Sequence, residues 1–409
     1  MIRRDSEVAP RVAPHSSNTK TSSRATASGD GHPKRMEDHV PQRLVFVDAL
    51  KAIASQLIIL HHLAFYGPMS DRASQLAPEL FAWFSDYARI AVQVFLVLGG
   101  FLAAKGLAPQ GNLVAGNPVA LIGRRYLRLA VPCVAVLALA VVFASIARGW
   151  MQHDSIPAPP TGEQLIAHVT LLQDVLGFEA LSAGLWYVAI DLQLFVLFLA
   201  VLWFAQRFAE PAGAQRWLGP AIVGALALAS LFFFNRDPAW DRWATYFFAA
   251  YAMGASAYWI VQRQRCAPAL GWLSLAVIVS LALDFRLRIA VALGVAVLLV
   301  LAGRSGVLTR WPGGRALAFL ARIAYSVFLV HFPVCLVVNA ACVRFLPDDP
   351  WLHALGMILA WVASVLIGAL FYHLVESRTD TLITQARRLA RSAIARVPRL
   401  RQSQSGAET

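Results

Sequence analysis

The sequence predicts an all-α integral membrane protein with about ten transmembrane helices in one bundle. Of its 409 residues, 58% are hydrophobic and only 14% are charged, whereas an average soluble domain carries about 25% charge. Apolar stretches long enough to cross a bilayer recur along most of the chain. So few charges cannot cover so much apolar surface, so the bundle is expected to face lipid.

The elements follow in order along the chain. Residues 1–42 are polar and lack apolar periodicity, which predicts a disordered cytoplasmic segment. A transmembrane domain is expected over 43–376 and a basic cytoplasmic tail over 377–409. The tail is expected either to lie as a helix on anionic lipid or to be a plain positively charged end. The predicted spans are 44–66, 81–104, 127–148, 184–206, 217–234, 242–261, 268–284, 286–303, 317–343 and 351–374.

The loop charges predict the orientation of the bundle. An even number of spans places both ends of the chain on one side. Arginine clusters follow the second, fourth, sixth, eighth and tenth spans, on the side of the N-terminus, so both termini are predicted to be cytoplasmic. The net charge of +13 lies mainly in loops and tails, which suits anionic lipid headgroups better than nucleic acid. The four cysteines form no pair at metal-ligand spacing, so no metal site is expected.

The first span carries a polar stripe. Lys51 and His62 are eleven residues apart, close to three helical turns, so they share a face about 16 Å apart along the axis. Asp48 lies on the same face, whereas His61 is turned about 100° away. His62, roughly 27 Å into the membrane, is therefore the candidate general base. The alternative is an interfacial histidine pair with a Lys51–Asp48 ion pair that stabilises the helix.

A basic cluster, Arg124, Arg125 and Arg128, opens the third span. Arg125 and Arg128 are three residues apart, so they project from neighbouring positions on a helix and would clamp a phosphate. A helix N-terminus at this point would add its own attraction for anions. The alternative is an ordinary stop-transfer cluster.

Three further residues are candidates for chemistry. Asp191 is an acid within the fourth span and needs a cationic or hydroxyl partner across the bundle. His331 lies near mid-membrane, where Pro333 frees a backbone carbonyl that a lone histidine would bind. Glu376 lies just after the tenth span. It is either a functional residue or an exposed acid at a helix end with no further role. The Gly99–Gly100 pair favours close helix packing.

The order of these motifs resembles that of the membrane acyltransferase-3 family, bacterial O-acyltransferases that modify surface glycans. The similarity runs from Arg43 to Glu376. Asp48, Lys51 and His62 match the family's opening motif, with Lys51 in the basic position. The family's other motifs are met by segments 95–101, 125–128, 186–195, 325–333 and 372–378.

Three positions depart from the family pattern. Gly99 replaces a serine, so a hydroxyl role there is absent, and Arg378 replaces a proline. Asp191 replaces a glutamate, which keeps the charge but shortens its reach. Some members of this family carry an extracytoplasmic extension, and none is expected after the tenth span of this chain. Transfer is therefore expected to finish within the membrane domain or on a partner protein.

The resemblance implies an O-acyltransferase of the bacterial cytoplasmic membrane. It would move an acyl group, acetyl as the first expectation, from cytoplasmic acyl-CoA to a hydroxyl of a glycan or lipid-linked glycan. The arginine cluster would bind the CoA phosphates, and Lys51 would hold the donor or a developing negative charge. Either His331 or Asp191 would reach toward His62, and Glu376 would pair with Lys51 or the arginines. A second copy of the chain or an export-complex protein is an alternative further partner.

Two other functions fit the same pattern. A proton-coupled transporter or flippase of a glycan-pathway metabolite would also need buried charges and a mid-membrane histidine. The lack of a detectable internal repeat and the Arg-x-x-Arg cluster count against it. A scaffold in a polysaccharide-export complex would use the polar stripe for helix packing alone.

Overall fold

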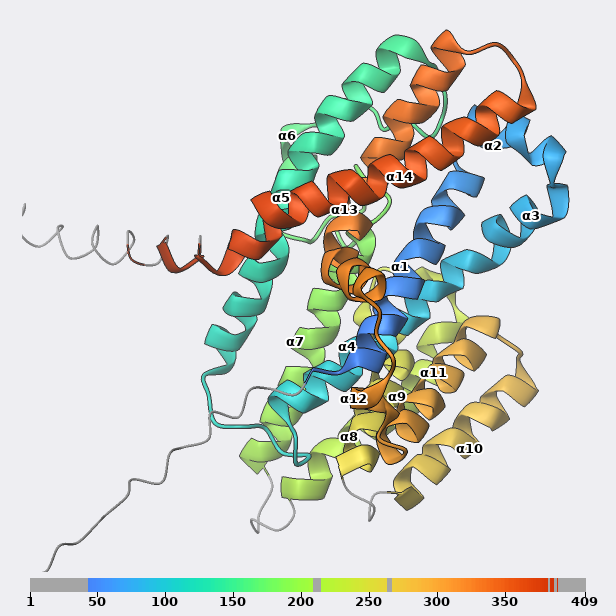
Figure 1. The fold of residues 1–409 in the computed structure, drawn as a ribbon. Coiled ribbons are helices and arrows are strands. Elements are labelled where there is room, and N and C mark those ends of the chain that lie inside the picture. The colour runs from blue at the N-terminus through green and yellow to red at the C-terminus, as the bar shows by residue number, and fades with distance from the viewer. Residues whose placement is uncertain (1–42, 209–214, 263–266, 382, 386–387, 389–409) are drawn as a thin grey trace, which may run out of the picture. The chain divides into compact units, whose positions relative to one another are not determined.

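The computed structural model describes residues 43–208, 215–262, 267–381, 383–385 and 388. Within these residues the chain forms helices and turns, with no strand (Figure 1). This confirms the predicted all-α membrane fold. The N-terminal segment 1–42 and most of the basic tail 377–409 lie outside the described residues, and the predicted cytoplasmic side of the termini stays a prediction.

Ten helices in this part of the chain coincide with the predicted spans: α1 (Val45–Phe65), α4 (Val92–Leu107), α5 (Pro118–Trp150), α7 (Leu185–Phe208), α8 (Gln215–Phe232), α9 (Ala244–Gln262), α10 (Ala267–Leu283), α11 (Leu287–Arg304), α13 (Arg315–Phe345) and α14 (Pro350–Leu374). Eight spans in the described residues are long and apolar enough to cross a membrane. The other two helices are α9 and α10, of which α10 has only 17 residues. α9 is nevertheless buried along most of its length, among α4, α8 and α11.

Short elements connect these helices on the side to which α1 leads. They are α2 (Pro68–Ala73), α3 (Pro78–Tyr87), the 3₁₀ turn η2 (Ala88–Ala91), α6 (Gly162–Val169) and the 3₁₀ turn η4 (Pro238–Trp240). α3, η2 and α4 continue one another over Pro78–Leu107, so the second span begins earlier than predicted. α12 (Val307–Arg310) and η6 (Glu376–Arg378) lie toward the other end of the bundle.

α5 also begins earlier than predicted, because local capping starts the helix before the arginine cluster. The Asn117 side chain accepts hydrogen bonds from the backbone N–H groups of Val119 and Ala120, and Pro118 occupies the first helical position. Both residues favour a helix start. The basic cluster therefore lies in the second and third turns of α5, and the predicted helix N-terminus at the arginines is wrong.

The core is built on direct backbone contact between α4 and α9. A Cβ atom at Gly100 would lie 1.8 Å from the carbonyl oxygen of Tyr251, and one at Gly254 would lie 1.8 Å from that of Val97. Only glycine allows two helices to approach so closely. This is the close approach that the glycine pair in the second span predicted.

The functional side chains are positioned by α1 and α13. α1 lies in the middle of the bundle, and α13 packs against α1, α5 and α14 (Figure 1). This packing places the last turn of α1 beside the middle of α13, so two polar segments far apart in the sequence come together.

Candidate active site

Two histidines form a pair at the contact of α1 and α13. Nδ1 of His62 lies 2.6 Å from Nε2 of His331, and the two rings are nearly parallel, with centroids 4.8 Å apart. Both side chains are buried; His331 is 0% exposed. Of the two partners predicted for His62, the structure therefore selects His331.

The hydrogen bonds around His331 determine which ring nitrogens of the two histidines carry a hydrogen. Nδ1 of His331 lies 2.8 Å from the carbonyl oxygen of Phe328 and 3.2 Å from that of Val327. Carbonyl oxygens only accept, so this Nδ1 carries a hydrogen, and in neutral His331 the Nε2 is an acceptor. His62 then donates from Nδ1, which leaves the Nε2 lone pair of His62 free. This network assigns the tautomers and makes His62 an oriented proton acceptor.

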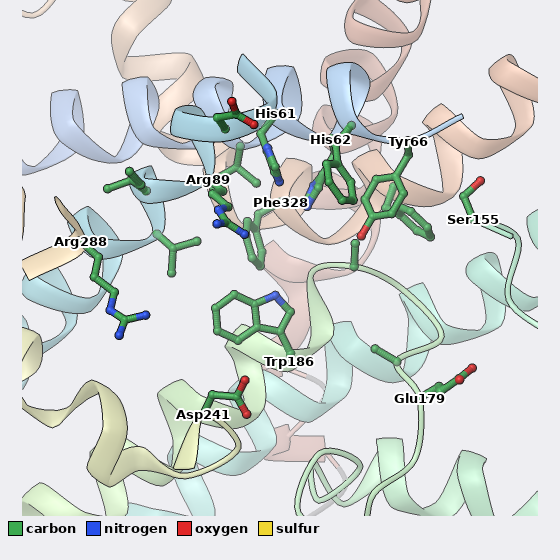
Figure 2. Close-up of a pocket in the computed structure, with 18 of the residues that line it drawn as sticks. His61, His62, Tyr66, Arg89, Ser155, Glu179, Trp186, Asp241, Arg288 and Phe328 are labelled. Carbon is green, nitrogen blue, oxygen red and sulfur yellow. The ribbon is translucent and has the colours of Figure 1, made fainter. Parts of the chain in front are cut away.

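His62 lines a cavity of about 980 Å³ (Figure 2). The wall comes from the end of α1, from η2 and the start of α4, and from the loops around α6. The residue after η4, the first turn of α11 and the middle of α13 complete it. It combines aromatic side chains such as Trp186 and Phe328 with charged ones, including Arg89, Asp241 and Glu179. The catalytic candidate thus faces a large, mixed-polarity space and not lipid.

His61 also lines this cavity, which the helical angle did not predict. Its Nδ1 lies 3.2 Å from the carbonyl oxygen of Phe84 in α3. α3 and η2 pack along the side of α1, so the cavity wall extends around the helix beyond the polar stripe. His61 therefore lines the cavity although it is turned away from the polar stripe of α1.

A second polar group, the inner cluster, lies toward the beginning of α1. Its members are Asp48, Lys51, Arg125, Asp191 and Glu376. Arg125 donates to Asp191 at 2.5 Å, and the Asp191 side chain is only 8% exposed. Lys51 lies within electrostatic range of Asp48, Arg125 and Glu376. The structure therefore gathers five predicted site residues at one end of the bundle, away from His62.

The individual pairings in the inner cluster differ from several expectations. Asp191 has the cationic partner that its burial predicted, and this pairing with Arg125 directs it away from His62. Asp48 pairs with Arg43 at 2.7 Å, so the proposed Lys51–Asp48 ion pair is not formed. Glu376 accepts a hydrogen bond from Ser326 at 2.5 Å.

The basic cluster does not form a simple phosphate clamp. Arg125 is held by Asp191 and lies over the ring of Phe195, 5.5 Å from its centroid. Arg128 is exposed and lies 3.4 Å from Asp380. Arg124 is exposed as well. The two residues of the Arg-x-x-Arg motif thus have separate partners, and Arg124 and Arg128 remain open to a ligand from outside the bundle.

An aromatic layer of Phe95, Tyr187 and Phe328 separates the two polar groups. The Phe328 ring centroid lies 5.5 Å from that of Tyr187 and 6.0 Å from that of Phe95. Phe328 lines the cavity, whereas Tyr187 lies within electrostatic range of Asp191 and Arg125. Among the described residues, no member of the inner cluster lines the cavity.

Sequence reasoning missed several cavity residues, above all Arg89 and Gln93. Both occur in the otherwise apolar stretch that begins the second span, four residues apart. This spacing places two polar groups on one helical face. It is the feature of the sequence that could have identified Arg89 and Gln93 as site residues. The loop acids Asp241 and Glu179 carry no comparable pattern. No group of three metal-binding side chains is present in the described part of the chain.

The fold is that of a multi-pass membrane protein, and the buried imidazole pair is its candidate site for proton transfer. Comparison with known proteins gives the family: residues 44–373 match the family model described as an acyltransferase domain. This chain belongs to the membrane acyltransferase-3 family, as its motif order indicated, and is a membrane acyltransferase. No curated protein and no solved structure matches it.

Proposed function

We propose that this acyltransferase moves an acyl group, acetyl in the first instance, from cytoplasmic acyl-CoA to a hydroxyl of a cell-surface or exported glycan. Its setting would be the bacterial cytoplasmic membrane. The observation that carries the proposal is the His62–His331 pair, with the free Nε2 of His62 in a cavity of about 980 Å³. A base with an orienting partner is what hydroxyl activation requires.

In the proposed reaction, the acceptor hydroxyl binds in the cavity and gives its proton to Nε2 of His62. Its oxygen attacks the thioester carbonyl, so a C–O bond forms and an oxyanion develops. When the carbonyl re-forms, the C–S bond breaks and the CoA thiolate takes the proton from His62. His331 stabilises the imidazolium that exists between these steps, because its Nε2 accepts from Nδ1 of His62.

The composition of the cavity supports a sugar-like acceptor. Trp186 offers an aromatic face, and Asp241 and Glu179 offer carboxylates that accept hydrogen bonds from hydroxyls. Figure 2 shows Trp186 and the two acids on the side of the cavity opposite His61 and His62. A glycan held between these groups would place a hydroxyl toward the histidines.

The donor would enter from the inner cluster. Arg124 and Arg128 are exposed there, and Lys51 lies nearby within the bundle. These cations would hold the CoA phosphates. The pantetheine arm would then cover the three turns of α1 between Lys51 and His62, about 16 Å. Because the aromatic layer lies across this route, its side chains would have to move aside for the thioester to reach the cavity.

The proposal is tested with the purified full-length protein, [¹⁴C]acetyl-CoA and surface glycan from a strain lacking this protein. We expect His62→Gln to abolish transfer to the glycan, and His373→Gln, at an exposed position outside the cavity, to leave it unchanged. Mass spectrometry of glycans from the deletion strain should show the loss of one acyl mass. Wild-type turnover by His62→Gln would overturn the mechanism.

A further inference from the structure

The proposed reaction places negative charge on the acyl oxygen beside His62. An oxyanion of this kind is stabilised most by hydrogen-bond donors already aimed at its position. The sequence suggested Lys51 for a developing charge, but Lys51 lies three turns away along α1, about 16 Å, and it does not line the cavity. The donors must therefore come from the cavity wall near the histidine pair.

Arg89 and Gln93 lie on that wall. Arg89 is in η2 and Gln93 is in the first turn of α4, and both line the same cavity as His62. Their spacing of four residues places them one above the other on one helical face. α1 ends on the side where α4 begins, so the two residues lie at the depth of the last turns of α1. Figure 2 shows Arg89 beside His61 and Phe328, on the same side of the cavity as His62.

Neither residue has a polar partner among the described residues. No carboxylate lies within 4.0 Å of the Arg89 guanidinium, although Arg89 is close enough to His61 to affect it electrostatically. Gln93 is only 7% exposed, yet its amide makes no hydrogen bond with the described residues. Because Gln93 lines the cavity, a molecule bound there would complete the hydrogen bonds of its amide.

The other cations of the cavity are already engaged. Arg286 donates to the side chains of Asn235 and Ser280. Arg288 donates to the backbone carbonyl of Asn235 and lies over the ring of Tyr246. These contacts hold both residues in the wall, although the Nε–H of Arg288 has no partner among the described residues. Arg89 and Gln93 lie on the wall near His62, and their side-chain N–H groups make no hydrogen bond with the described residues.

We propose that Gln93 and Arg89 form the oxyanion hole of this acyltransferase. In the tetrahedral intermediate, the Gln93 amide N–H and the Arg89 guanidinium donate to the former carbonyl oxygen while His62 holds the proton. The electron pair returns to re-form the carbonyl when the C–S bond breaks, so both contacts are strongest in the intermediate. This inference rests on the proposed transfer to a hydroxyl at His62.

The experiment measures kcat and KM separately for acetyl-CoA with the purified protein and deacylated surface glycan, following CoA thiol release. Gln93→Glu replaces the donor with a group that repels an oxyanion, and Gln93→Met removes the donor at similar volume without adding charge. We expect both to lower kcat about 10²- to 10³-fold with little change in KM. Arg89→Gln should lower kcat, and Arg89→Lys should restore part of the loss.

One matched control is Gln56→Glu, at a residue outside the cavity whose side-chain oxygen accepts a hydrogen bond from Trp361. The other is Arg344→Gln, at an exposed position in the last turn of α13. Both should keep the wild-type kcat. Folding of each variant is checked by gel filtration and thermal unfolding. Wild-type kcat in Gln93→Met, or a change confined to KM, would overturn the oxyanion assignment. If the oxyanion assignment failed while His62→Gln abolished turnover in the same assay, the proposed function would still stand. An active His62→Gln variant would overturn both the proposed function and the oxyanion assignment.

Discussion

At the scale of single residues, the orientation of the His62 ring depends on a backbone carbonyl. The carbonyl of Phe328 accepts from Nδ1 of His331, and this makes Nε2 of His331 an acceptor for His62. The first hydrogen bond sets the tautomer of His331, and that tautomer sets the tautomer of His62. The proposed base is therefore oriented by two successive hydrogen bonds that begin at the α13 backbone. The proposed proton acceptor therefore needs no nearby carboxylate, and Asp191 is free to balance Arg125.

Substitution of His331 tests these two hydrogen bonds. His331→Leu removes the acceptor for Nδ1 of His62, so kcat should fall about 10²- to 10⁴-fold, the range for general-base catalysis. His331→Gln retains a carbonyl oxygen that accepts from His62, and it should recover part of the activity. The measurement is kcat with KM for acetyl-CoA, which should change little. Equal activities of the two variants would show that His331 does not position His62 in this way.

The Arg125–Asp191 pair is predicted to stabilise the bundle. Asp191→Asn leaves the partly buried Arg125 without its counter-charge, which should cost about 1–3 kcal/mol. Removal of both charges in Arg125→Gln/Asp191→Asn should recover much of this loss, because no unpaired charge remains. Thermal unfolding in detergent measures all three variants. If the double variant were as unstable as the sum of the single ones, the two side chains would not be coupled.

At the scale of elements, the α4–α9 contact depends on glycine. Gly254→Ala would place a methyl group 1.8 Å from the carbonyl oxygen of Val97, so the helices must separate. We expect a loss of about 1–3 kcal/mol, the usual cost of overpacking, seen as a lower unfolding temperature. The matched control is Gly294→Ala in α11, where a Cβ meets no atom within 4 Å. Gly294→Ala should be neutral or slightly stabilising because alanine favours the helix.

The helices themselves could be predicted, because length and apolarity are local properties of the chain. Their ends were less predictable: the cap at Asn117 starts α5 well before its most apolar part. The position of Asp191 within an apolar span indicated a cationic or hydroxyl partner but did not indicate which residue, and the partner is Arg125. His62 and His331 are 269 residues apart, and no pattern in a single sequence states which helices become neighbours. The oxyanion candidates were missed because Arg89 lies in a 3₁₀ turn whose packing against α1 is a tertiary property.

At the scale of the molecule, the two polar groups lie at different depths with the aromatic layer between them. The cavity with its acids and aromatic rings suits a hydroxyl acceptor, and the inner cluster suits a phosphorylated donor. In the proposed reaction, this separation would let each substrate reach the site from its own side of the membrane. The rings of Phe95, Tyr187 and Phe328 contact one another between the two groups.

This arrangement predicts sidedness. With the arginine-rich loops in the cytoplasm, sealed inverted membrane vesicles should consume added acetyl-CoA, because the inner cluster then faces the medium. Sealed right-side-out vesicles should be inactive until detergent opens them, since acetyl-CoA is charged and does not cross lipid. Vesicles carrying His62→Gln supply the background rate. A higher rate in sealed right-side-out vesicles than in inverted ones would mean that the donor enters through the cavity that holds His62, and the role proposed for Arg124 and Arg128 would then be wrong.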